Sequence, residues 1–287
     1  MEIKTVLVVG AGTMGHGIAQ VAAQSGYAVH LYDVDAKSVA AGMARIKGNL
    51  DKGVERGKVT PADRDATLGR ITAAHDLRMA AVDADLVIEA APERMDLKLK
   101  IFGEVTATAP EHAILASNTS SLSIGGIAQM CGRPTHVVGM HFFNPVHLKP
   151  LLEVVRTAET APDVLAKVVE VGKKMGKDVI VVNDSPGFAT SRLGIALGLE
   201  AIRMVEEGVA SPSDIDTAME KGYGHAIGPL RTTDLVGLDV RLGIAEYLDG
   251  CFPGGRFQPP QLLKKMVSEG KLGQKSGHGF YDWTRKA

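Results

Sequence analysis

The chain has 287 residues, 45% of them apolar, and a mean hydropathy of +0.06, which indicates a globular protein of one large or two ordinary domains with a substantial core. Its formal net charge of −1 gives no general attraction to nucleic acid or to an anionic membrane, and no run approaches the roughly 18 apolar residues of a membrane span. Two widely separated cysteines, Cys131 and Cys251, favour a reduced, cytoplasmic environment, and we expect no targeting segment and no metal site.

Short apolar segments alternate with helix-like segments through the first half of the chain. Strands are predicted at Thr5–Val9, Ala28–Tyr32, Leu86–Glu89, Ile114–Ala116, Val137–Met140, Leu151–Val155 and Val179–Val182. Helices are predicted near Met14–Ser25, Ala36–Lys52, Arg94–Thr108 and Val164–Met175. This alternation is typical of an α/β fold with a mostly parallel sheet covered on both faces by helices.

The strand signal stops after Asn183-Asp184-Ser185-Pro186-Gly187, and only helix-like segments follow. Helices are predicted at Ala189–Glu207, Pro212–Glu220, Thr233–Tyr247 and Pro260–Ser268. The pattern therefore predicts a first domain over residues 1–187 and a smaller, all-helical second domain over residues 188–287.

A glycine-rich turn leads from the first strand into the first helix. Its sequence is Gly10-Ala11-Gly12-Thr13-Met14-Gly15. The first glycine permits the tight turn, the second lets the backbone approach a pyrophosphate, and the third allows close packing of helix on strand. Asp33, at the end of the second strand, can bond the ribose hydroxyls and would repel a 2′-phosphate. The combination predicts a Rossmann-type domain that binds NAD rather than NADP, although glycine turns of this form also occur without a ligand.

Glu153 interrupts the apolar run of the predicted strand Leu151–Val155. Burying a polar group without a hydrogen bond costs about 2–7 kcal/mol, and an isolated carboxylate costs more. Glu153 therefore implies a specific partner, and the nearest candidate in sequence is His141, which directly follows another apolar strand. A carboxylate that orients an imidazole is half of an acid–base pair.

Several polar groups follow predicted strands at the sheet edge where ligands bind in parallel folds. They are the glycine turn, Ser117-Asn118-Thr119-Ser120, His141 and Asn144. Each has an ordinary alternative, since most histidines cap or pack and Ser, Thr and Asn clusters usually build turns. Their shared edge favours a catalytic role for His141 and Ser120, and a bond from Asn144 to nicotinamide or substrate.

These motifs in this order resemble the L-3-hydroxyacyl-CoA dehydrogenases over essentially the whole chain, most closely the short bacterial 3-hydroxybutyryl-CoA dehydrogenases. The resemblance rests on Gly10–Gly15, Ser117–Leu122, His141-Phe142-Phe143-Asn144-Pro145, Glu153 and Asp184–Phe188. It implies reversible oxidation of (S)-3-hydroxyacyl-CoA to 3-oxoacyl-CoA with NAD. It further implies His141 as general base, Glu153 as its partner, Ser120 at the reacting oxygen of the substrate and Asn144 at the nicotinamide.

The family resemblance also implies roles for residues outside the motifs quoted above. Glu93 and Lys98 match family residues near the cofactor, Lys275 in the tail is a further match, and the family pairs subunits through its helical domain. Ser191 stands where many members carry asparagine. A serine is shorter and lacks the two-ended carboxamide, but it can still bond a substrate carbonyl, directly or through water.

A basic face on the second helix is a candidate contact for coenzyme A. Arg45, Asn49, Lys52 and Arg56 recur at helical spacing. Such a face is usually solvated surface, although it could hold phosphates. Asn49 and Arg56 fall where the resembled family contacts CoA, which leaves both interpretations open.

Three alternatives remain at this stage. The same chemistry could act on a functionalised substrate such as 3-hydroxyadipyl-CoA, in which a terminal carboxylate needs a cationic or hydrogen-bonding partner. A non-catalytic role, as in lens crystallins that use this fold, needs only stability and solubility, and the retained set of site residues argues against it. A dehydrogenase of the 3-hydroxyisobutyrate or 6-phosphogluconate type would use a lysine from the second domain in place of His141.

Overall fold

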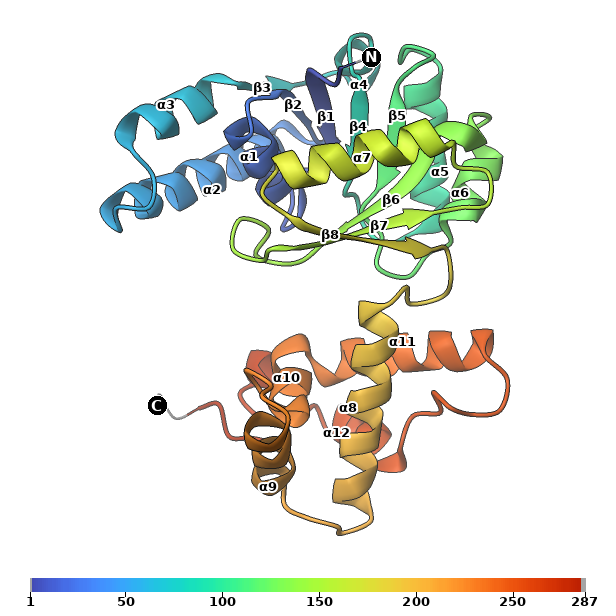
Figure 1. Cartoon of the computed structure of the whole chain (residues 1–287). Coiled ribbons are helices and arrows are strands. Elements are labelled where there is room, and N and C mark those ends of the chain that lie inside the picture. Colours follow the sequence, from blue (N-terminus) through green and yellow to red (C-terminus); the bar gives the residue numbers. More distant parts are fainter. Residues whose placement is uncertain (1, 285–287) are drawn as a thin grey trace. The chain divides into compact units, whose positions relative to one another are not determined.

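The computed structural model describes residues 2–284 and divides into two compact units, one ending at Ser185 and the other beginning at Pro186 (Figure 1). The domain boundary that the sequence predicts lies after Gly187. Among the described residues, no helix combines the length and apolar character needed to cross a bilayer. The same residues contain no group of three or more His, Cys, Asp or Glu side chains arranged to hold a metal ion.

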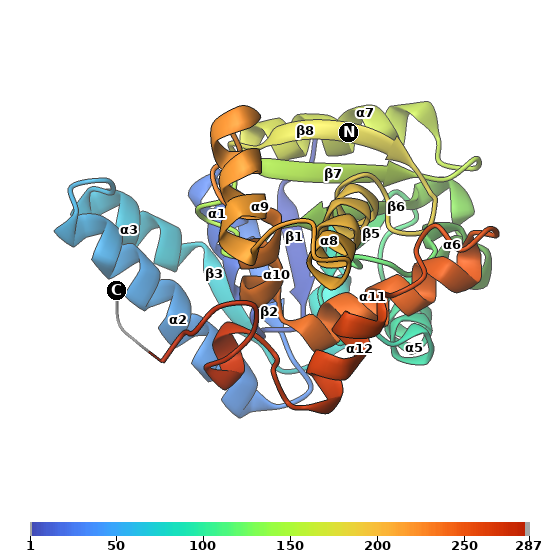
Figure 2. The same ribbon diagram turned by 90° about the horizontal axis from the view of Figure 1, so that it is seen from below.

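The first unit is built on an eight-stranded sheet of order β3-β2-β1-β4-β5-β6-β7-β8. Its strands are β1 (Thr5–Val9), β2 (Ala28–Tyr32), β3 (Ile71–Ala74), β4 (Leu86–Glu89), β5 (Ile114–Ser117), β6 (Val137–Phe142), β7 (Leu151–Arg156) and β8 (Asp178–Asn183). Neighbours from β3 through to β6 pair in parallel, whereas β7 runs antiparallel to β6 and parallel to β8. Strands β5 to β8 lie side by side in Figure 2. The predicted α/β fold with a mostly parallel sheet is confirmed.

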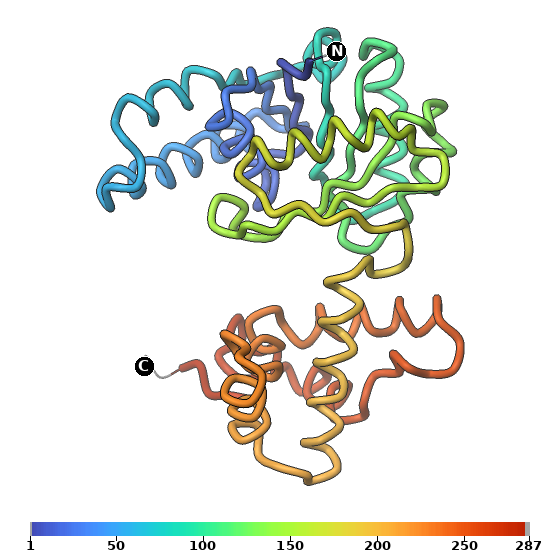
Figure 3. Tube along the Cα trace, viewed as in Figure 1, coloured from blue at the N-terminus to red at the C-terminus, as the bar shows by residue number. Residues whose placement is uncertain are grey.

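Helices connect and cover these strands. They are α1 (Gly15–Gln24), α2 (Ala36–Glu55), α3 (Pro61–Gly69), α4 (Leu77–Ala81), α5 (Met95–Thr106), α6 (Ile124–Met130) and α7 (Pro162–Lys174), with a short 3₁₀ turn at Pro134–His136. One core cluster joins α1, α2 and α7 to alternate side chains of the strands, such as Val6 and Val8 of β1. Helices α2 and α3 lie against each other, as the trace in Figure 3 shows.

The sequence marks only the start of α3, where the N-cap residue Thr60 precedes Pro61, and three short elements of the first unit were missed: β3, α4 and α6. Each has seven residues or fewer, which is too short for a clear periodic signal. Strand β6 is also longer than predicted, because it continues through His141 to Phe142. His141 therefore lies within the sheet rather than in a loop after it.

The second unit is helical. It contains α8 (Thr190–Glu206), α9 (Pro212–Thr217), a π-helical turn (Ala218–Gly222), α10 (Pro229–Val236), α11 (Leu238–Cys251), α12 (Gln261–Ser268) and a 3₁₀ turn (Gln274–Ser276). The single helix predicted at Thr233–Tyr247 is wrong. Gly237 has φ of +103° and separates α10 from α11, a conformation that side chains other than glycine rarely adopt.

Two buried carboxylates fasten the tail to the helices of the second unit. Asp234 accepts hydrogen bonds from the backbone N–H groups of Phe280 and Tyr281 and from the indole N–H of Trp283. The Tyr281 hydroxyl donates to Asp216 at 2.7 Å. The tail is thus held by directed polar contacts as well as by apolar packing.

Candidate active site

The glycine turn forms one end of a pocket of about 540 Å³ in the first unit. A side chain at Gly10, where φ is +103°, would place its Cβ 2.7 Å from the Ala90 carbonyl oxygen. A Cβ at Gly15 would lie 1.6 Å from the Gly10 carbonyl oxygen, so only glycine allows α1 to approach the turn this closely. At Gly12 a Cβ would meet no atom within 4 Å, which shows that this part of the backbone faces open space.

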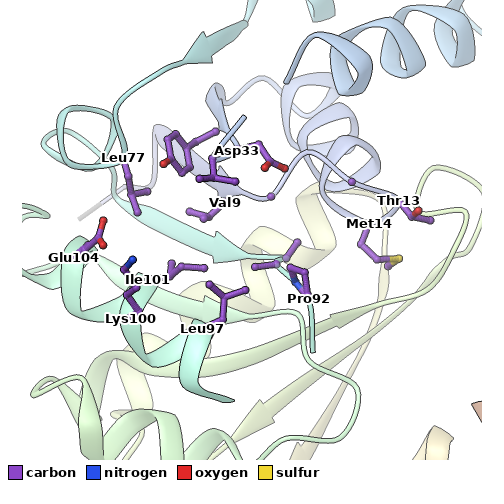
Figure 4. A pocket seen from close by; sticks show the side chains of 16 residues that line it. Val9, Thr13, Met14, Asp33, Leu77, Pro92, Leu97, Lys100, Ile101 and Glu104 are labelled. Atoms are coloured by element: carbon purple, nitrogen blue, oxygen red, sulfur yellow. The ribbon is translucent and has the colours of Figure 1, made fainter. Parts of the chain in front are cut away.

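Asp33 follows β2 and lies on the wall of this pocket between its two ends (Figure 4). One carboxylate oxygen accepts a hydrogen bond of 2.8 Å from the Ala11 N–H, which fixes the carboxylate beside the glycine turn. Thr13 and Met14 line the end of the pocket nearest α1, while apolar side chains line much of the remainder. An open glycine backbone, a helix N-terminus and a fixed carboxylate are the groups that a pyrophosphate and a ribose require, so these residues fit NAD.

His141 and Glu153 face each other across two neighbouring strands. The antiparallel register of β6 and β7 places the two residues directly opposite. Nδ1 of His141 lies 2.7 Å from Oε2 of Glu153, and Glu153 has no exposed surface. Because an ionised carboxylate only accepts hydrogen bonds, Nδ1 carries the proton in this pair. The partner that the sequence analysis assigned to Glu153 is therefore confirmed.

Asn118 joins the end of β5 to the end of β6. Its side-chain oxygen accepts a hydrogen bond of 2.9 Å from the backbone N–H of Phe142, the residue after His141. The loop that carries Ser120 begins at Asn118, so this bond holds the Ser120 loop beside the histidine strand. The ring of Phe143 lies with its centroid 4.5 Å from that of His141.

Glu93 organises the Ser120 loop. One of its carboxylate oxygens accepts hydrogen bonds from the Thr119 hydroxyl, from the backbone N–H groups of Ser120 and Ser121, and from both serine hydroxyls, at 2.6–3.3 Å. Burial raises the pKa of Glu93, but these bonds and the charge of Lys98 outweigh it, so the pKa lies below its ordinary value. Glu93 and Ser120, which the family resemblance placed near cofactor and substrate, are thus in direct contact.

Lys98 lies beneath this loop and has no exposed side-chain surface. Its ammonium donates to both carboxylate oxygens of Glu89, at 2.8 and 2.9 Å, and to the Ala91 carbonyl. The second oxygen of Glu93 lies 3.5 Å away. The three N–H donors of a lysine are therefore engaged within the protein, and Lys98 acts on the site through Glu93 rather than from the pocket wall.

Glu89 was missed as a site residue by the sequence analysis. It ends β4 with no exposed surface, and besides Lys98 it accepts hydrogen bonds from the Ser117 hydroxyl at 2.6 Å and the Ala91 N–H at 2.7 Å. Its carboxylate thus connects the end of β5 with the segment after β4, which lines the pocket. The signal was present, because a charge at the end of a fully buried strand implies a partner, as it did for Glu153.

The remaining predicted site residues occupy separate places. Asn144 is exposed in the loop after β6. Asn49, half-buried on α2, donates to the Gln20 side chain of α1 at 3.1 Å, and Arg56 is exposed at the end of α2. In the second unit, Ser191 lies half-buried in the first turn of α8, and Lys275 pairs with Asp239 of α11. The contacts of Asn49 and Lys275 are structural ones within their own units.

Two family models together match nearly the whole chain. The model described as 3-hydroxyacyl-CoA dehydrogenase, NAD binding domain, matches residues 5–185, and the model described as 3-hydroxyacyl-CoA dehydrogenase, C-terminal domain, matches residues 187–283.

Relatives that match over almost the whole of this chain give the same result. A Bacillus subtilis protein named as a probable 3-hydroxybutyryl-CoA dehydrogenase is 44% identical over 286 residues, covering 100% of this chain and 99% of that protein. An Escherichia coli protein named 3-hydroxyadipyl-CoA dehydrogenase is 39% identical over 284 residues, covering 99% of this chain and 60% of that protein. The crystal structure of an (S)-3-hydroxybutyryl-CoA dehydrogenase from Ralstonia eutropha aligns with a TM-score of 0.96 at 40% identity, covering 99% of this chain and all of that one.

Proposed function

This chain belongs to the 3-hydroxyacyl-CoA dehydrogenase family, and from that membership we propose that it reversibly oxidises (S)-3-hydroxybutyryl-CoA to acetoacetyl-CoA with NAD. The observation that carries the proposal is the buried His141–Glu153 pair, which is the acid–base device that the oxidation of an alcohol needs. NAD, when bound, supplies the acceptor for the hydride that leaves C3 of the substrate.

In the proposed reaction, the chain's own residues manage the proton of the 3-hydroxyl group. Glu153 accepts the Nδ1–H bond and orients the ring, and Nε2 of His141 is proposed as the atom that takes the hydroxyl proton. As the imidazole becomes positively charged, the carboxylate stabilises that charge in a buried setting where electrostatic interactions are strong. In the reverse direction, the imidazolium returns the proton to the carbonyl oxygen.

Ser120 is proposed to bond the reacting oxygen of the substrate. Its hydroxyl lies 3.3 Å from Glu93, which also binds the Ser120 backbone N–H, so the loop conformation is fixed before the substrate arrives. Asn144 is proposed to contact the nicotinamide. Contacts of Asn49 and Arg56 with CoA, of Ser191 with the substrate and of Lys275 with the cofactor are likewise proposals from the family resemblance.

The direct test replaces His141 by glutamine. We expect His141→Gln to lower kcat/KM for acetoacetyl-CoA reduction by about 10²–10⁴, because proton transfer in the transition state is lost. The dissociation constant for NADH should change little. The control is His136→Gln, at the last residue of the 3₁₀ turn that precedes this strand and outside the pair. Full activity of His141→Gln, combined with inactivity of Lys275→Met, would instead favour a dehydrogenase with a catalytic lysine.

The E. coli relative favours one second candidate, 3-hydroxyadipyl-CoA. Comparison of kcat/KM for acetoacetyl-CoA and 3-oxoadipyl-CoA with NADH distinguishes the two substrates. A higher value for 3-oxoadipyl-CoA would replace the proposed substrate and keep the mechanism. No NADH oxidation with either substrate would support a non-catalytic, crystallin-like role.

We further propose a cytoplasmic homodimer that associates through the helical domain, residues 188–287. Large apolar side chains are exposed on three of its helices, for example Leu193 of α8, Leu235 of α10 and Val240 of α11. Association would remove these apolar side chains from water, which favours an interface on this domain. Sedimentation equilibrium of the wild type and of Leu193→Asp tests the dimer, since the charged variant should shift the protein toward monomer.

A further inference from the structure

The pocket beside the glycine turn has two ends with different chemistry. Thr13 and Met14 mark the end at the glycine turn, Asp33 lies between the two ends, and Lys100 and Glu104 of α5 lie at the opposite end (Figure 4). A pyrophosphate bound at the glycine turn and a ribose bound at Asp33 leave only this far end for the adenine ring. The chemistry of the far end therefore determines which base the pocket accepts.

The far end combines an apolar wall with two opposite charges. Leu77 and Ile101 are buried pocket residues that offer flat apolar contact to a base. Lys100 is exposed and Glu104 half-buried, and both line the pocket. Residues four apart on a helix are neighbours on its surface, so an ammonium and a carboxylate lie next to each other at this end.

Both charged side chains are available to a ligand. Within residues 2–284, neither the Lys100 nor the Glu104 side chain forms a hydrogen bond or an ion pair of 4.0 Å or less, with each other or with any other residue. Glu104 also acts across the pocket, because the pKa of Tyr32 on β2 is raised by burial and then by the charges of Glu104, Asp33 and Asp76. The Glu104 side chain lines the same pocket as Tyr32, as Figure 4 shows.

We propose that Glu104 and Lys100 read the outer edge of the adenine ring, with Glu104 accepting a hydrogen bond from the 6-amino group and Lys100 donating one to N1. Adenine presents a donor beside an acceptor on this edge, and a carboxylate beside an ammonium presents the complementary pair. Hypoxanthine reverses the pattern, with an oxygen at position 6 and a proton on N1. This inference rests on the proposed function only in that NAD is the cofactor.

The test compares two dinucleotides that differ only at this edge. Dissociation constants of the full chain for NADH and for reduced nicotinamide hypoxanthine dinucleotide are measured by nicotinamide fluorescence, without acyl-CoA. We expect the wild type to bind NADH about five- to tenfold more tightly, since two partly exposed hydrogen bonds are at stake. Equal affinities for the two dinucleotides would overturn the proposal.

Variants of Glu104 and Lys100 test which side chain causes the preference for NADH. Glu104→Gln should bring the affinity ratio to one or below, because the glutamine amide can donate to the 6-oxo group of hypoxanthine. Lys100→Met should reduce the ratio more weakly. The control Glu159→Gln removes an equal charge from an exposed loop outside the pocket and should keep the wild-type ratio. If Glu104→Gln weakens both dinucleotides by the same factor, or changes neither, Glu104 does not read the base.

Turnover and dinucleotide affinity together distinguish failure of this inference from failure of the proposed function. If acetoacetyl-CoA is not reduced but NADH is still preferred over its hypoxanthine analogue, the substrate proposal fails and base reading stands. If turnover is normal and the preference is absent, base reading fails alone. If neither dinucleotide binds, both fail.

Discussion

His141 of β6 and Glu153 of β7 are paired residues of one antiparallel ladder, and their side chains meet at 2.7 Å. Directly opposed residues of such a ladder have Cβ atoms roughly 5 Å apart, so the backbone itself brings the imidazole and the carboxylate together. Neighbouring strands on both sides, β5 and β8, hold the two ladder strands in place. The acid–base pair is therefore built on rigid elements rather than on loops.

Glu153→Gln tests the electrostatic part of this pair. The amide oxygen can still accept the Nδ1–H bond, but it carries no charge to stabilise the imidazolium. We expect kcat for hydroxyacyl-CoA oxidation to fall by about 10² or more, with an NADH dissociation constant close to that of the wild type. Steady-state kinetics and fluorescence titration measure the two quantities. An unchanged kcat, when deuterium at C3 of the substrate shows that chemistry limits the rate, would exclude the proposed role.

The strands around this pair could be predicted from sequence, but their directions could not. Short apolar runs bounded by turn residues gave β1, β2 and β4 with the bounds that the structure has. Periodicity contains no information on strand direction, and only the antiparallel course of β7 puts Glu153 opposite His141. The pair was nevertheless predicted, because the cost of burying a lone carboxylate requires a partner whatever the topology.

Other features depended on contacts that the sequence pattern does not contain. Lys98 was predicted near the cofactor by family resemblance, and its burial against Glu89 follows from the packing of α5 on the end of β4. The break at Gly237 was missed because a single glycine within an apolar periodic segment is often tolerated in a helix. Here its positive φ, which few other residues adopt, ends α10.

Substitutions of Glu89 and Lys98 should have strongly coupled effects on the free energy of unfolding. Lys98→Met leaves the Glu89 carboxylate buried without a counter-charge, and we expect a loss of about 3–5 kcal/mol in the free energy of unfolding. The double variant Lys98→Met/Glu89→Gln removes both charges and should be less destabilised than Lys98→Met alone. Urea denaturation of the four proteins in the cycle measures the coupling. Additive effects of the two changes would contradict the buried pair.

The same cycle also tests whether Lys98 acts on the site by positioning Glu93. A merely structural role would leave cofactor affinity of the folded double variant unchanged. A positioning role predicts weaker NADH binding, because the loop organised by Glu93 loses the nearby ammonium. Lys98→Arg, which keeps the charge, should retain more of the NADH affinity than Lys98→Met.

Glu93 gives a pH-dependent contribution to stability. Its pKa in the folded chain lies below the ordinary value of 4.5, so its stabilising effect is present above that value and is lost as the pH falls through the lower folded pKa. We expect the wild type to have a higher Tm than Glu93→Gln at pH 7, and the difference to shrink progressively below about pH 4.5. Thermal denaturation at several pH values measures it. A difference that grows on acidification would have the wrong sign for this network.

The tail of the second unit provides a prediction with its own spectroscopic signal. Asp234 is buried and accepts three hydrogen bonds, one of them from the indole of Trp283, which is the single tryptophan of the chain. Asp234→Asn turns one acceptor into a donor that faces N–H groups, and a buried group left unsatisfied costs about 1–3 kcal/mol. We therefore expect the tail to detach at lower urea concentration than in the wild type, with a red shift of the Trp283 emission that precedes the loss of helical circular dichroism. Glu246→Gln, an exposed change on α11, is the control and should show a single coincident transition. Coincident transitions in Asp234→Asn at the wild-type midpoint would mean that apolar packing alone holds the tail.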